Sequence, residues 1–326
     1  MMTAGDASTR PYLTIIATGR NDDFGGDFNG RFFRALHFNH QQLSAAGIAH
    51  EFVFVEWRPI DTRPLLASLL ADEFAAVTSL SLRCYVVDPA YHDALSLNPR
   101  LQFQEFIAKN VGLRRARGEF VLTTNTDIYL SRRVIARLQE RTLAPGVLYR
   151  AARHDLKPER DVSAVDWDLL EDERNCEVVN GIQPPLFTNA SGDFLLLDRQ
   201  SSHRLRGFNE IYRVAKIHID GNFCVKAYAS GIRIVDIGAP VYHVGRGTLH
   251  AQIGMYRARS HEAPWGDMRW KSDMIYENSD AWGLGLARER AIDRGTTFLA
   301  FDWHAVGPMV DLGRVMSSRK RQERAS

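Results

Sequence analysis

This sequence has few cysteines, a formal net charge of only +2 and no long apolar run. The three cysteines in 326 residues, Cys84, Cys176 and Cys224, lie far apart and form no CxxC pair. We therefore expect reduced thiols, and neither a disulfide framework nor a zinc site. Lys and Arg number 41 against 39 Asp and Glu, so no basic field favours nucleic acid as a partner. No apolar run approaches the ~18 residues that cross a bilayer, and residues 1–10 lack a signal-peptide core. These absences predict a soluble, cytoplasmic protein.

Three familiar signatures of nucleotide and hydrolase chemistry are also missing. The glycine-rich loop at residues 25–30 is not GxGxxG, and no GxxxxGK[ST] or GxSxG motif occurs. A dinucleotide oxidoreductase or a P-loop NTPase would therefore lack its phosphate cradle. An α/β-hydrolase would lack its nucleophile elbow.

The first half of the chain instead alternates strand patterns with helix patterns. Its order predicts a mainly parallel, doubly wound α/β sheet flanked by helices. No repeat or low-complexity linker divides the chain, so we expect one α/β domain with a C-terminal extension. The predicted strands begin at residues 13, 52, 83 and 120, and the predicted helices cover 32–46, 64–74 and 99–116.

Polar side chains follow the predicted strands where each one ends. Asn125 and Asp127 come just after the strand that begins at Phe120. Because ligands bind outside the carboxyl ends of strands in open α/β sheets, these two oxygen-bearing groups suit Mg²⁺ or Mn²⁺ beside a phosphate. The alternative for a strand-end Asp is a cap or a turn former.

A wider pattern is carried by the segments 14–22, 53–59, 108–120, 125–127, 192–197, 206–210, 218–227 and 241–245. Together these segments resemble family 2 glycosyltransferases with a GT-A fold. The similarity runs in the family's order from about Tyr12 to Gly247. It implies a nucleotide-sugar-binding and catalytic domain over residues 1–247. Residues 248–326 would form an extension that packs on or lids the active site.

This resemblance implies inverting transfer of a sugar from a nucleoside diphosphate sugar, of UDP or GDP type, to an acceptor hydroxyl. The acceptor would be a glycan, a lipid-linked sugar or a small molecule. A divalent metal, Mn²⁺ or Mg²⁺, would stabilise charge on the leaving diphosphate. Asp127 matches the last residue of the DxD motif, whose first Asp is Asn125 here, with Thr126 between them. His243 matches the histidine that closes the metal site, and its alternative is a half-buried structural histidine.

The acceptor side of the reaction needs a base, and the resemblance places Asp220 there. The acidic neighbour usual in the family is Ile219 in this chain. Asp220 could instead cap a helix. His218 would orient the acceptor or only fill the turn, and Gly192 and Asp193 match the acceptor-side loop.

Donor recognition is assigned by the same resemblance to the first strands of the domain. Thr18, Arg20 and Glu56 would line the base and ribose pocket, because hydrogen-bonding groups give specificity there. Arg83 and Lys109 would steady the base or the phosphates, or else be ordinary charged residues.

The end of the chain carries a basic segment from about residue 314, including Arg319, Lys320 and Arg321. Following a partly apolar stretch, it suggests peripheral contact with anionic lipid. The alternative is a docked helix with a soluble end. Trp265, Asp267 and Trp282 would stack sugars or pack a lid.

Two other functions stay open at this point. Asn125 and Ile219 replace acidic residues, which suggests a catalytically impaired member that only binds a nucleotide or glycan. A sugar nucleotidyltransferase would share a related sheet, but its Gly-rich, Arg-containing signature does not follow the first strand.

Overall fold

The computed structural model describes residues 10–157, 164–213, 218–244 and 275–310. The strands of a large sheet are β1 (Leu13–Gly19), β2 (His50–Trp57), β3 (Ser81–Val87), β4 (Phe120–Thr123), β6 (Val147–Arg150), β9 (Leu195–Asp198), β10 (Arg233–Asp236), β12 (Arg288–Asp293) and β13 (Thr296–Ala300). A small sheet contains β5 (Ile128–Leu130), β7 (Arg153–Leu156), β8 (Cys176–Asn180) and β11 (Val241–His243). The helices are α1 (Phe28–Ala45), α2 (Leu66–Glu73), α3 (Pro89–Leu95), α4 (Glu105–Arg115), α5 (Arg132–Gln139), α6 (Trp167–Glu171), α7 (Arg199–Leu205), α8 (Ile219–Ala229) and α10 (Trp303–Val310), with short 3-10 turns η1 (Glu173–Asn175) and η2 (Ser191–Asp193).

Within the described ranges, the large sheet has nine strands in the order β10-β6-β9-β4-β1-β2-β3-β13-β12. Its centre, from β4 to β13, is parallel throughout. Strand β9 runs antiparallel to both β4 and β6, and β12 runs antiparallel to β13. The predicted fold class, a mainly parallel α/β sheet flanked by helices, is therefore confirmed.

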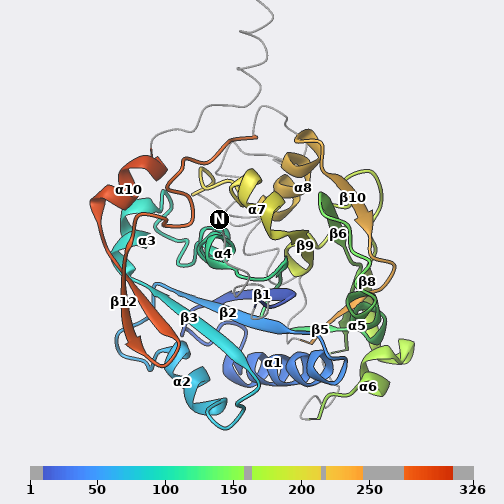
Figure 1. Cartoon of the computed structure of the whole chain (residues 1–326). Helices are drawn as coiled ribbons and strands as arrows, with labels where there is room; N and C mark the ends of the chain where they lie inside the picture. Colours follow the sequence, from blue (N-terminus) through green and yellow to red (C-terminus); the bar gives the residue numbers. More distant parts are fainter. Residues whose placement is uncertain (1–9, 158–163, 214–217, 245–274, 311–326) are drawn as a thin grey trace, which may run out of the picture.

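Helices cover both faces of this sheet. Figure 1 shows α1 and α2 on one side of the central strands, and α4, α7 and α8 on the other. Strand side chains alternate between the two layers, since Ile15 packs with the α1 side and Ile16 with the α4 side. A strand buried on both faces is apolar at nearly every position, and residues 13–17 are apolar apart from Thr14.

Two glycines bring α4 and β4 close to β1. A Cβ on Gly112 would lie 2.6 Å from the Ile16 side chain, and a Cβ on Gly118 would lie 2.5 Å from the Thr14 backbone nitrogen. Because contacts this short leave no room for a methyl group, helix and strand can approach β1 only with glycine at these positions. Because β1 and β4 are parallel neighbours, their carboxyl ends lie side by side at one edge of the sheet.

The region after residue 274 returns to the large sheet, where β13 pairs with β3. Trp282 is buried and contacts Arg114 on α4 and His203 on α7. The predicted boundary at 247/248, Trp265, Asp267 and the basic tail from about 314 fall outside the described residues. None of the helices that the structure describes is long and apolar enough to cross a membrane.

Candidate functional site

The turn after β4 lies at the carboxyl edge of the large sheet and leads directly into β5. The backbone N–H of Thr124 still donates to the carbonyl of Ile16 on β1, at 3.0 Å. Strand β5 then pairs antiparallel with β11, so that Ile128 faces His243. This register brings His243 beside Asp127, although 116 positions separate them in the sequence.

Asp127 and His243 form the centre of the site. The Oδ2 atom of Asp127 lies 3.4 Å from Nε2 of His243 and accepts a hydrogen bond from Arg31 at 3.1 Å. Burial raises the pKa of Asp127, but His243 and Arg31 outweigh it, and the pKa falls below its ordinary value. Burial likewise lowers the pKa of His243, while Asp127 and Asp155 together raise it to about 10. Each of the two groups therefore stabilises the charged form of the other.

The far ring nitrogen of His243 is also held. Its Nδ1 lies 2.7 Å from Oδ1 of Asp155 on β7. A carboxylate on the outer nitrogen orients a metal-bound histidine in many proteins. Asp127 and His243 could therefore hold a divalent ion if the ion displaced the proton on Nε2 of His243. Within the described ranges, no group of three or more His, Cys, Asp or Glu side chains is placed to hold a metal by itself.

Asn125 is tied to both sides of the turn. Its Oδ1 accepts from Lys109 at 2.9 Å, and its Nδ2 donates to Oδ1 of Asp193 at 2.6 Å. Because Lys109 can only donate and an ionised Asp193 can only accept, the amide has one satisfactory orientation. Lys109 is fully buried and also donates to Glu105 and to the Gly192 carbonyl, which engages all three of its N–H donors. Its contacts make Lys109 a tie between Asn125 and the Gly192 loop.

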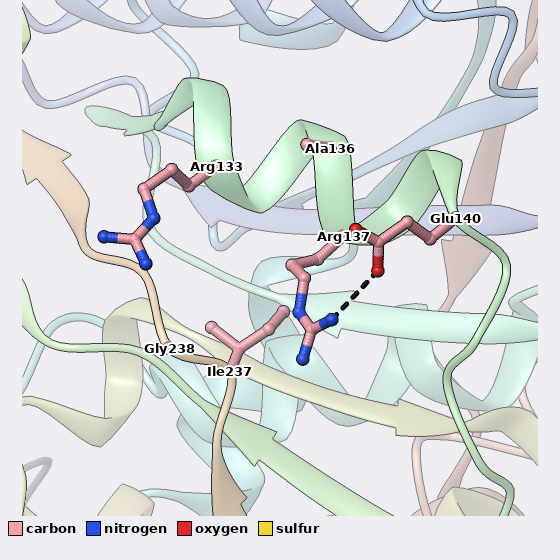
Figure 2. A pocket seen from close by; sticks show the side chains of 6 residues that line it. All are labelled: Arg133, Ala136, Arg137, Glu140, Ile237 and Gly238. Carbon is pink, nitrogen blue, oxygen red and sulfur yellow. Dashed lines mark hydrogen bonds and ion pairs between the residues drawn. The ribbon is translucent and has the colours of Figure 1, made fainter.

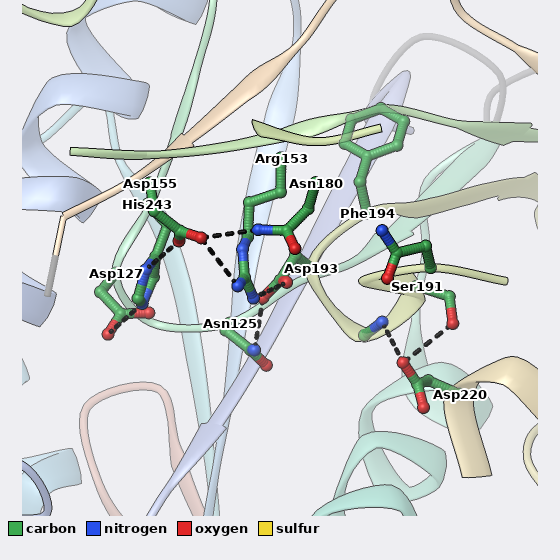
Figure 3. Close-up of polar contacts among 12 residues, drawn as sticks. Asn125, Asp127, Arg153, Asp155, Asn180, Ser191, Asp193, Phe194, Asp220 and His243 are labelled. Carbon is green, nitrogen blue, oxygen red and sulfur yellow. Dashed lines mark hydrogen bonds and ion pairs between the residues drawn. The ribbon is translucent and has the colours of Figure 1, made fainter. Parts of the chain in front are cut away.

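Arg153 on β7 connects the two halves of the site, as Figure 3 shows. It donates to Oδ2 of Asp193 at 2.7 Å and to Oδ2 of Asp155 at 3.0 Å. Asn180 on β8 donates to the same Asp155 oxygen at 2.6 Å. A continuous chain of contacts thus runs from Asp127 through His243, Asp155 and Arg153 to Asp193.

Asp220 joins this cluster through the loop before β9. It lies in the first turn of α8, and its Oδ2 accepts from the Ser191 hydroxyl at 2.8 Å and from the Gly192 N–H at 2.7 Å. The alternative that it caps α8 does not match the geometry, because His218 is the N-cap residue and makes no side-chain cap bond. Among the described residues, none hydrogen-bonds to Oδ1 of Asp220.

Arg150 holds the loop before β9, residues 187–194, through hydrogen bonds to its backbone. This side chain is fully buried and donates to the carbonyls of Phe187, Asn189 and Phe194. Burial lowers its pKa, although nearby Cys224 and Asp220 oppose that shift. Arg150 therefore fixes the backbone on both sides of Gly192 and Asp193.

The structure brings together the predicted residues Lys109, Asn125, Asp127, Gly192, Asp193, Asp220 and His243. Thr126 lies in the same turn and is partly exposed. His218 precedes α8 with a left-handed φ of 67°.

The donor residues predicted from the first strands are not joined to this network by any contact between described residues. Glu56 is fully buried, and its two oxygens accept from the N–H groups of Leu66 and Ala67 at the start of α2. Burial raises the pKa of Glu56. Its carboxylate is thus occupied by the helix it caps, which leaves no oxygen directed to a ribose.

Arg83 lies near the amino end of β3, at the edge of the sheet opposite the Asp127 turn. There it forms a bidentate pair with Glu51 and donates to the Arg115 carbonyl. Arg20 and Thr18 do lie at the carboxyl end of β1, where Arg20 donates to the Arg58 carbonyl and pairs with Asp22. Roles for all four residues in donor binding stay predictions, and the placement of Arg83 and Glu56 lends them no support.

Sequence reasoning missed Arg31, Arg153, Asp155 and Asn180. A basic residue one turn into the helix after a glycine-rich loop was a signal for Arg31. The consecutive residues Arg153, His154 and Asp155 make β7 unusually polar for a strand, and this could have drawn attention to it. Asn180 carries no local signal.

A surface groove of about 350 Å³ lies elsewhere, along α5 and the turn before β11 (Figure 2). Its lining includes Arg133, Arg137, Glu140 and Ile237, and Arg137 pairs with Glu140 at 2.9 Å. None of its lining residues belongs to the network around Asp127.

No protein-family model matches this chain, and no curated protein does. Solved structures similar to it include the catalytic domain of Drosophila β1,4-galactosyltransferase 7 in complex with xylobiose, with 14% identity, a TM-score of 0.36 and coverage of 90% of this chain and 96% of that chain. A glycosyltransferase involved in glycosylation of the major capsid of PBCV-1 shows 9% identity and a TM-score of 0.33 over 76% and 100% of the two chains. A proposed glucose-1-phosphate thymidylyltransferase from Bacillus anthracis, in complex with a sucrose, shows 12% identity and a TM-score of 0.37 over 78% and 96%. These identities and scores are too low to assign an activity.

Proposed function

We propose that this protein is a GT-A-type glycosyltransferase that moves a sugar from a nucleoside diphosphate sugar to an acceptor hydroxyl with inversion. One observation carries the proposal. The donor-side residues Asn125 and Asp127 and the acceptor-side residues Asp193 and Asp220 belong to a single cluster of hydrogen bonds and ion pairs at the carboxyl edge of the sheet. Open α/β sheets bind their ligands at this edge.

Asp127 and His243 would hold the divalent ion, Mn²⁺ or Mg²⁺, which when bound neutralises charge on the departing diphosphate. Asp155 keeps His243 oriented toward Asp127. Asn125 acts through its neighbours, because its oxygen and nitrogen are both engaged by Lys109 and Asp193. It fixes the turn that carries Asp127.

Asp220 is the proposed general base. Its Oδ2 is anchored by Ser191 and Gly192, which sets the direction of the carboxylate. Its Oδ1 is then the oxygen that accepts the proton of the attacking hydroxyl. A positioned base of this kind contributes about 10²-fold to 10⁴-fold to the rate.

The hydrogen bonds of Asn125 to Lys109 and Asp193 also favour a second candidate function. With one DxD position withdrawn from metal binding, the chain would bind a nucleotide or glycan without transferring sugar. The same assay separates the two candidates.

Incubation with UDP-sugars and GDP-sugars, Mn²⁺ and a panel of acceptors should release nucleoside diphosphate. D220N should lower turnover by about 10²-fold or more with donor binding retained, and D127A should weaken donor binding. D166N is the matched control, because Asp166 is also a helix-start carboxylate that accepts a backbone N–H, from Leu169, outside the cluster.

Unchanged turnover in D220N would remove Asp220 from the role of base. Nucleotide binding by calorimetry without transfer or donor hydrolysis across the panel would establish the binding function instead. Release of pyrophosphate from a nucleoside triphosphate would indicate a nucleotidyltransferase.

A further inference from the structure

Arg31 on α1 contacts Asp127 in the cluster and has no assigned role in the proposed sugar transfer. The residue is 9% exposed. Its Nη1 donates to Oδ2 of Asp127 at 3.1 Å, and its Nη2 donates to the Phe24 carbonyl at 2.6 Å. Its Nε is buried and has no hydrogen-bond partner among the described residues. A guanidinium has five N–H donors, so most of its donor capacity is not used by these two contacts.

The glycine-rich loop before α1 closes over this guanidinium. Gly25 has a φ of +78°, and a Cβ there would lie 3.0 Å from Nη2 of Arg31. A side chain at position 25 would therefore strain the backbone and press on the cation. Asp23 fastens the loop to the helix by accepting from the Phe28 N–H at 2.9 Å. Loop and arginine form one unit beside the Asp127 turn.

Among the described residues, Arg31 pairs with one carboxylate. Asp127 is the carboxylate that pairs with Arg31, and the same oxygen also faces His243. The second carboxylate on His243, Asp155, is shared with Arg153. Two of the five N–H groups of Arg31 are thus engaged, one by Asp127 and one by the Phe24 carbonyl. Guanidinium groups bind phosphate oxygens in a bidentate fork, which a compact ammonium cannot reproduce.

We propose that Arg31 is a binding residue for the diphosphate of the donor. The inference rests on the proposed function and adds a residue to it: the guanidinium contacts phosphate oxygens next to the Asp127 turn, and the glycine-rich loop holds it there. Loss of Arg31 weakens recognition of the diphosphate and leaves recognition of the nucleoside unchanged.

The test is isothermal titration of the full chain, in buffer containing Mn²⁺, with UDP and GDP and with uridine and guanosine. R31Q should weaken binding of the preferred diphosphate by about 10-fold to 100-fold and leave binding of the matching nucleoside unchanged. R34Q is the matched control, because Arg34 lies one turn further along α1 and pairs with Asp27. It should bind the diphosphate like the wild type.

R31K decides the case in which R31Q does not fold. It keeps the positive charge beside Asp127 and loses the fork, so it should bind the diphosphate more weakly than the wild type does. Wild-type affinity for the diphosphate in R31K, or in a folded R31Q, would overturn the assignment of Arg31 alone. Failure of the wild-type protein to bind either diphosphate would overturn the proposed function and, with it, this inference.

Discussion

Replacing Asn125 with aspartate would restore the acidic DxD pattern and is expected to destabilise this protein. In the wild type, Nδ2 of Asn125 donates to Asp193 over 2.6 Å while Oδ1 accepts from Lys109 over 2.9 Å. N125D converts the donor into a carboxylate oxygen that faces the Asp193 carboxylate. Lys109 remains in place on the other side.

The magnitude follows from three contributions. Two unit charges about 4 Å apart interact by about 4 kcal/mol at an effective dielectric constant near 20. The new repulsion from Asp193 and the new attraction to Lys109 therefore nearly cancel. The charge-assisted hydrogen bond to Asp193 is lost, and bonds of this kind contribute about 1.5–3 kcal/mol. We expect the free energy of unfolding to fall by about 2 kcal/mol near neutral pH.

Urea and thermal unfolding of wild type, N125D and N125A measure this effect. N125A loses both hydrogen bonds without adding a charge. The difference in stability between N125D and N125A therefore shows the effect of the added carboxylate. At about pH 5, N125D should recover stability relative to N125A. A proton shared between the carboxyl groups of residues 125 and 193 then restores a hydrogen bond. If N125D were as stable as wild type near neutral pH, or showed no such recovery, Asn125 would not be held by Asp193 as described.

Two further predictions concern the fold that supports the site. Burial lowers the pKa of His92 from 6.5 to about 4, and its Nδ1 accepts from the Trp57 indole. Since the folded state binds this proton less tightly, the stabilisation is present above pH 6.5 and is lost as the pH falls through the window to about 4. The wild type should lose up to about 3 kcal/mol more than H92Q in that window, measured by urea unfolding at several pH values, and parallel curves would contradict this. G118A should cost about 2 kcal/mol or more, because its Cβ would lie 2.5 Å from the Thr14 backbone nitrogen, whereas a Cβ on Gly181 would meet nothing within 4 Å. Equal melting temperatures for G118A and G181A would refute the close approach.

The parallel centre of the sheet could be predicted from the sequence because its strands are buried on both faces. Mostly apolar runs mark β1 and β2. The observed strands begin at residues 13 and 50, where the sequence predicts 13 and 52. Gly47 follows the first helix with a φ of +68°, as a glycine C-cap requires. Helix α4 begins later than predicted, at Glu105.

The small sheet could not be predicted in this way. Strands β5 and β11 contain three residues each, too few for a periodic pattern, and β8 is largely exposed. Yet this sheet carries His243, Arg153 and Asp155 into the site.

The missed contacts share one physical cause, which is their separation along the chain. Arg31 and Asp127 are 96 positions apart, and Asp155 and His243 are 88 apart. Such pairs form only after the strands have paired, so local patterns do not encode them. Asp127 could be singled out because it lies next to a recognisable strand end, whereas only the resemblance to family 2 glycosyltransferases points to Asp220.

The C-terminal hairpin has a consequence for any shortened form of this protein. Strand β13 occupies the outer edge of β3, and β12, with every residue exposed and with Arg288, Glu289, Arg290 and Asp293 among them, forms the final edge of the sheet. Charged residues on an edge strand discourage pairing with a second molecule. In a chain that ends before Arg288, the edge of β3 that pairs with β13 would have no partner strand. Residues 84–87 of β3 are buried and mostly apolar. Protection of this apolar strand edge therefore depends on residues that lie far from it in the sequence.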